Sequence, residues 1–124
     1  HTDNRRQRQM CIRDRKILPI DGYLNQVYKH GEHHLILYNN SHVALYENGE
    51  VVLNAKLSGP ISYAEWSDIE QGWHVAGWRE LLFLSTTKQN RIQIDEIAVF
   101  VDATTGLYLC NDGKWDIIDI QEEE

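Results

Sequence analysis

The residues of this chain most able to do chemistry are histidines, four of which lie within a short stretch. They are His30, His33, His34 and His42, and their imidazole nitrogens could ligate zinc or copper. Their spacing matches no zinc motif, and a structural zinc site usually adds cysteines, which this stretch lacks. Alternation along a strand would also direct His33 and His34 to opposite faces. These four are the candidate metal ligands, but we expect no metal site and no cofactor.

Aromatic side chains form a second group within residues 63–78. Its members, together with one histidine, are Tyr63, Trp66, Trp73, His74 and Trp78. Such clusters stack on sugars or bases and anchor protein interfaces, yet they also fill the cores of chains that contain few Phe residues. His74 could form an acid–base pair with Asp68 or Glu80, although an acidic chain offers such pairs by chance. We interpret the five residues as the candidate binding residues.

Motifs for catalysis are absent from the sequence. It contains no Gly-x-Ser-x-Gly, no glycine-rich phosphate loop, no His-Glu-x-x-His and no calcium-binding loop. Cys110 falls in an expected hairpin rather than beside a base. We therefore name no catalytic residue, and an enzyme is the less favoured interpretation.

Residues 1–15 resemble the translation of a transposon-type DNA sequencing adapter. The resemblance is carried by residues 5–15, which read RRQRQMCIRDR. The alternative is a natural basic arm of the kind that binds nucleic acid. Since the segment holds Met10 and Cys11, the resemblance implies that the natural start is missing and that Cys110 has no disulfide partner. We expect one small, N-terminally truncated domain over residues 16–124, of bacterial or phage origin.

The charge of that domain restricts its partners. Residues 16–124 carry seven Lys or Arg against seventeen Asp or Glu, a net charge of −10. Such a surface repels phosphate backbones, so we expect no direct nucleic-acid binding and consider a basic protein the fitting partner, unless the charge serves solubility alone. No apolar run reaches the roughly 18 residues of a membrane span. A cytoplasmic location is the default.

Most of the domain has the pattern of β-strands. We expect strands at 35–38, 42–47, 50–55, 80–85, 91–101, 107–110 and 115–120. Asn48-Gly49 predicts a type I′ turn that places Glu47 opposite Glu50. A two-residue turn at Asp112-Gly113 would place Cys110 opposite Trp115.

Residues 62–71 instead have the pattern of a helix. Ser62 and Glu65 form a capping box, and Gly72 would end the helix. Trp66, Ile69 and Trp73 would form one stripe facing the sheet. Residues 21–29 fit a short helix or a hairpin turn, and we slightly favour the helix.

Together these elements predict an α+β fold in which two three-stranded antiparallel meanders, about six strands in all, bracket one helix near 62–71. The favoured function is a small acidic interaction module that binds another macromolecule. An acidic inhibitor or immunity-type protein that mimics nucleic acid at a basic site is the alternative. A small enzyme or metal-binding domain comes third.

Overall fold

The computed structural model describes residues 22–118, and their regular structure is entirely β. The strands in chain order are β1 (Leu24–His30), β2 (His33–Tyr38), β3 (His42–Glu47), β4 (Glu50–Lys56), β5 (Tyr63–Ser67), β6 (Gly72–Ala76), β7 (Glu80–Leu84), β8 (Gln89–Gln93), β9 (Ala98–Val101), β10 (Leu107–Cys110) and β11 (Trp115–Ile117). Within this range there is no helix long and apolar enough to cross a membrane. The expectations for residues 1–15 and for Asp21 lie outside the described residues.

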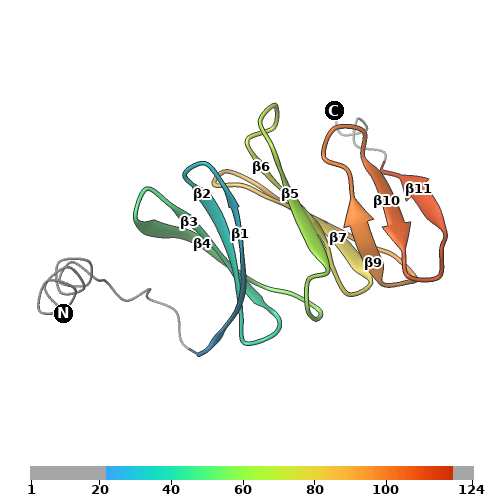
Figure 1. The fold of residues 1–124 in the computed structure, drawn as a ribbon, viewed down its shortest axis with the longest axis horizontal. Helices are drawn as coiled ribbons and strands as arrows, with labels where there is room; N and C mark the ends of the chain where they lie inside the picture. The colour runs from blue at the N-terminus through green and yellow to red at the C-terminus, as the bar shows by residue number, and fades with distance from the viewer. Residues whose placement is uncertain (1–21, 119–124) are drawn as a thin grey trace, which may run out of the picture.

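The strands form three antiparallel meanders that follow one another along the chain. Sheet A contains β1 to β4, sheet B contains β5 to β8, and sheet C contains β9 to β11. Every strand pairs with its neighbour in sequence, so short turns suffice to connect them. Figure 1 shows the sheets side by side along the long axis, with the first strands β1, β5 and β9 in contact in turn.

Sheet B lies between the other two sheets and is covered on both faces. Alternation directs Trp66, Val75 and Leu82 toward sheet A, where they join the largest apolar cluster of the protein. The intervening residues Ala76 and Leu81 face sheet C and pack against its first strand. This double coverage explains why all five residues of β6 are buried.

The expected helix at residues 62–71 is wrong, and with it the α+β assignment. Residues 63–67 form β5, and a turn leads directly into β6. The Glu65 carboxylate does not cap a helix; it accepts a hydrogen bond from the backbone N–H of Ala103 in the turn after β9, at 3.0 Å. Trp66 and Trp73 lie opposite each other on paired strands, while Ile69 is 91% exposed. A spacing of seven residues suits a helix face, but here it joins two positions across a hairpin.

The structure confirms some of the other expectations and corrects the rest. The Asn48-Gly49 turn is confirmed, because both residues have positive φ and Glu47 pairs with Glu50. The favoured helix before Gly31 is wrong over its described part, where β1 pairs with β2. The single strand expected at 91–101 is two strands, β8 and β9, which belong to different sheets. The described residues thus form eleven strands rather than about six.

One buried charge fastens the connection between sheets A and B. Glu80 at the start of β7 is fully buried. One of its carboxylate oxygens accepts the backbone N–H of Ser58 at 2.8 Å, and the other lies 3.4 Å from the Arg91 Nε. Arg91 also donates to the backbone carbonyl of Lys56 at 2.7 Å. Both side chains therefore hold the segment that leaves β4 against the edge of sheet B.

We predict that Arg91→Ala lowers the free energy of unfolding by about 2 kcal/mol. The change leaves the Glu80 carboxylate buried with one remaining donor, although the half-exposed arginine makes the cost smaller than the 3–5 kcal/mol of a fully buried pair. Urea unfolding measures the change. Lys29→Ala, at an exposed lysine, is the control, and the cost of Arg91→Ala should shrink in a Glu80→Gln background. An Arg91→Ala variant as stable as the control would contradict the role given to this pair.

Candidate functional site

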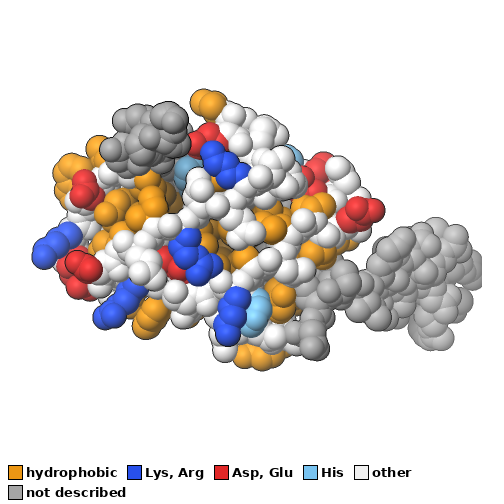
Figure 2. Space-filling model, turned by 180° about the vertical axis from the view of Figure 1, so that it is seen from behind, with side chains coloured by type: hydrophobic (Ala, Val, Ile, Leu, Met, Phe, Trp, Pro, Cys, Tyr) orange, Lys and Arg blue, Asp and Glu red, His pale blue; other side chains and the backbone are white. Residues whose placement is uncertain are grey.

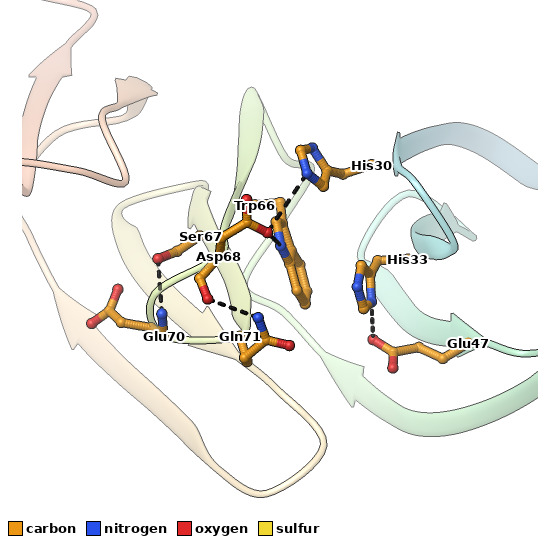
Figure 3. Close-up of polar contacts among 8 residues, drawn as sticks. All are labelled: His30, His33, Glu47, Trp66, Ser67, Asp68, Glu70 and Gln71. Atoms are coloured by element: carbon orange, nitrogen blue, oxygen red, sulfur yellow. Dashed lines mark hydrogen bonds and ion pairs between the residues drawn. The ribbon is translucent and has the colours of Figure 1, made fainter.

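Trp66 is the centre of a polar and aromatic cluster between sheets A and B, drawn in Figure 3. Its indole packs edge-on against Trp73 with 5.6 Å between ring centroids. The indole Nε1–H donates to the Asp68 carboxylate at 2.7 Å. Only 9% of the residue is exposed, so the ring belongs to the core and its polar atom is satisfied.

Two histidines from sheet A lie against this tryptophan. The His33 ring stacks on Trp66 with 3.8 Å between centroids and 14° between planes. Its Nδ1 lies 3.0 Å from a Glu47 carboxylate oxygen. His30 is farther along the same indole, with 6.1 Å between centroids, and its Nε2 lies 3.8 Å from Asp68. A histidine oriented by a carboxylate can act as a general base, but here one face of the His33 ring is covered by indole, and the contacts join two sheets.

The four histidines expected as candidate metal ligands do not meet. His30 and His33 lie beside Trp66, whereas His34 and His42 lie on the face of sheet A that points away from sheet B. There His34 contacts Tyr46 edge-on, and His42 lies 5.3 Å from the Tyr38 ring. Among residues 22–118 no three His, Cys, Asp or Glu side chains gather as a metal site would require.

Four of the five expected binding residues are distributed over both faces of sheet B, and Trp78 lies in the connection between β6 and β7. Trp66 and Trp73 point to sheet A, while Tyr63 and His74 point to the side of sheet C. His74 is buried and pairs with Glu70. Trp78 is 43% exposed, and its side chain covers Gly59, where any Cβ would lie 2.8 Å from it. The group therefore fills and borders the core, and it forms no single aromatic surface.

A cavity beside sheet C was not anticipated from the sequence. Its volume is about 310 Å³, and it lies between the β8–β9 connection and the β10–β11 hairpin. The lining residues are Ile94, Asp95, Glu96, Tyr108, Cys110, Asp112, Lys114, Trp115 and Asp116. This end of the molecule is on the left of Figure 2, where acidic, basic and apolar side chains lie next to one another. The cavity thus combines two aromatic residues with four carboxylates and one lysine.

Two of the four carboxylates have local partners, and the other two have none among the described residues. Asp112 accepts the backbone N–H of Lys114 at 3.0 Å, and Asp116 accepts the backbone N–H of Ile117 at 2.8 Å. Asp95 and Glu96 are exposed and make no hydrogen bond or ion pair with any described residue. The Lys114 ammonium, 4.0 Å from Asp112, is the one cation of the lining. The cavity therefore carries an uncompensated negative charge.

The pKa values of two groups beside these carboxylates, Cys110 and Tyr108, are raised. Burial and then the nearby Asp112 and Glu96 raise the pKa of the Cys110 thiol above its ordinary 9.0. Burial, followed by Asp116 and other anionic groups, raises the pKa of the Tyr108 hydroxyl. Both shifts favour the neutral form, as expected where negative charge accumulates near a partly desolvated group.

The register of the last hairpin, which borders this cavity, differs from the expected one. The expected two-residue turn at Asp112-Gly113 is wrong, because Leu109 rather than Cys110 lies opposite Trp115. The turn has one more residue, closed by a bond from the Cys110 N–H to the Lys114 carbonyl. That shift moves Trp115 from the face of Cys110 to the opposite face. The acids at 95, 96, 112 and 116 gather near the two turns of this region, which is the pattern in the sequence that could have revealed the site.

Comparison of the chain with protein-family models, with curated proteins and with solved structures finds no significant match in any of the three. The site is therefore interpreted from its own chemistry.

We predict that Trp66→Ala lowers the free energy of unfolding by about 3–5 kcal/mol, because it empties a core position that the two histidines and Trp73 surround. Trp115→Ala, at a tryptophan that is 61% exposed, should change it by less than about 0.5 kcal/mol. Ser62→Ala should also be neutral, since Ser62 caps no helix. Thermal unfolding of the three variants measures these differences, and equal losses for both tryptophans would contradict the placement of Trp66.

We also predict that the Cys110 thiol is alkylated slowly. In a Cys11→Ser background, its alkylation rate by iodoacetamide should rise at a higher pH than that of a free cysteine, since only the thiolate reacts. Asp112→Asn should move the rate profile to lower pH by removing one source of the raised pKa, whereas Glu32→Gln in sheet A should not. A profile that is unchanged by Asp112→Asn would contradict the electrostatic part of this account.

Proposed function

We propose that this protein is a binding module that recognises a positively charged macromolecule, with the cavity of sheet C as the contact site. The observation that carries the proposal is the lining itself, in which four carboxylates face one lysine. Such a cavity attracts cations and repels phosphate groups. A basic protein segment therefore fits it better than a nucleic acid does.

The partly apolar lining supports a macromolecular ligand over a simple ion. Tyr108 and Trp115 supply aromatic surface beside the acids, and aromatic rings hold the alkyl stems and cationic heads of Lys and Arg side chains. Asp95 and Glu96 are free to accept hydrogen bonds from such heads. Charge-assisted bonds of this kind are about twice as strong as bonds between neutral groups.

The other titratable clusters have structural contacts that account for them. His33 and Glu47 join sheet A to Trp66, and Glu80 and Arg91 hold the connection between sheets A and B. Each is built into the packing of two elements, whereas Asp95 and Glu96 contribute to no such contact. A free pair of acids at a cavity is the better candidate for recognition.

Binding of polylysine, followed by isothermal titration calorimetry, tests the proposal. We expect saturable binding whose affinity weakens by about tenfold or more as salt rises from about 50 to about 300 mM. Polyglutamate should not bind.

The double variant Asp95→Asn/Glu96→Gln should lower the polylysine affinity by about tenfold, the value of one or two lost charge-assisted contacts. The matched control is Glu32→Gln/Glu50→Gln, which removes the same net charge from exposed positions of sheet A. Equal losses in the two double variants would mean that the overall charge acts rather than the cavity. Absence of saturable binding would contradict the proposed function.

A further inference from the structure

The outer edge of sheet C differs from the outer edge of sheet B. Sheets A and B each have four strands, whereas sheet C ends at its third strand, β11. The outermost strand of sheet B, β8, presents mostly polar residues to solvent. By contrast, β11 exposes Trp115 and Ile117, at 61% and 53%. No described strand pairs with the free side of β11.

The backbone of β11 offers hydrogen-bonding groups along this free side. The Cys110 N–H donates to the Lys114 carbonyl, and the Ile118 N–H donates to the carbonyl of Gly106. Residues 114, 116 and 118 therefore turn their backbone groups toward β10, and residues 115 and 117 turn theirs outward, as antiparallel pairing requires. An edge of this kind is a template for another strand.

The two faces of β11 have opposite chemistry. Asp116 lies opposite Tyr108 on the side of the acidic cavity. Trp115 and Ile117 lie opposite Leu109 and Leu107 on the other side, which makes that side apolar, and Trp115, the first residue of β11, also borders the cavity. A strand added beside β11 would have alternate side chains on these same two sides. One set would meet carboxylates, and the other would meet exposed apolar residues.

We propose that β11 binds an extended segment of a partner protein as the fourth strand of sheet C, and that this segment alternates basic and apolar residues. The inference rests on the proposed function, and it specifies how the basic partner is held. Basic side chains of the segment enter the cavity near Asp95, Glu96 and Asp116, while its apolar side chains cover Trp115 and Ile117. Sheet C then has four strands, as the other two sheets do.

One contact of the free protein regulates access to this edge. The Ile117 N–H, which points outward, is held by the Asp116 carboxylate at 2.8 Å. This bond blocks part of the edge. Native proteins often block edge strands in such ways, which prevents unwanted pairing. A lysine or arginine that draws the Asp116 carboxylate into an ion pair frees the Ile117 N–H for the incoming strand. Charge recognition and strand pairing are thereby coupled.

The test compares two peptides of about seven residues, the length of a typical strand. One alternates lysine and valine, and its isomer has the same composition with lysines and valines in separate blocks. We expect the alternating peptide to bind about tenfold or more tightly than the isomer, because only the alternating one meets both faces of β11. N-methylation of the amides on one side of the alternating peptide should remove that advantage.

Ile117→Pro is the matching change in the protein, with Ile117→Val as its control. Proline removes only the outward N–H of Ile117, so pairing of β11 with β10 is retained, and circular dichroism checks that the fold is intact. The proline variant should bind both peptides equally weakly. As an independent measurement, hydrogen exchange at the Trp115 amide should slow when the alternating peptide binds.

The outcomes separate this inference from the proposed function. Equal affinity of the wild-type protein for both peptides, with Trp115 exchange unchanged, would overturn strand addition while leaving charge-based binding intact. Binding of neither peptide and of no polylysine would overturn both. A concentration-dependent dimer that Ile117→Pro abolishes would show that a second copy occupies the edge, and would also overturn the inference.

Discussion

Both faces of sheet B are apolar, and so the sheet requires a neighbour on each side. The tryptophans of β5 and β6 are covered by sheet A, and Ala76 and Leu81 by sheet C. Burial of apolar surface is the main source of stability in such a chain, and here it also fixes the order of the three sheets. The positions of the Trp66 cluster and of the cavity follow from that order. Trp66 meets the histidines of sheet A, and the last hairpin approaches the β8–β9 connection to form the cavity.

Local features of the fold could be predicted from the sequence, and features set by distant contacts could not. Asn48-Gly49 determines its turn because both residues tolerate positive φ, and β3 and β10 have the predicted bounds. Ser62 and Glu65 matched a capping box, but that motif spans only four residues. A hydrogen bond outweighed it: the Ala103 N–H donates to the Glu65 carboxylate from thirty-eight positions away in the sequence. The alternation of half-buried and buried residues through β5 becomes visible only when both neighbouring sheets are present.

The candidate site likewise depends on contacts between residues that are distant in the sequence. Sequence reasoning identified an acidic domain, and the basic partner and the mostly aromatic binding residues that it named both stay predictions. Trp66 and Trp73 are needed to fill the space between sheets A and B. Asp95, Glu96 and Asp112 come from two connections between strands and Asp116 comes from β11, so their proximity depends on how sheet C packs on sheet B. A difference of one residue in the β10–β11 turn was enough to exchange the faces of Trp115 and Asp116.

The serial arrangement of the sheets has a consequence for folding. Sheets A and C have no residue in a common apolar cluster, so each interacts mainly with sheet B. Chains built in this way behave as nearly one-dimensional systems, in which stability is approximately a sum of unit and nearest-neighbour terms. All strand pairs are also close in sequence, which favours rapid formation of each meander. Sheet C has three short strands and packs, within the described residues, on sheet B alone; we therefore expect it to open more readily than the junction of sheets A and B.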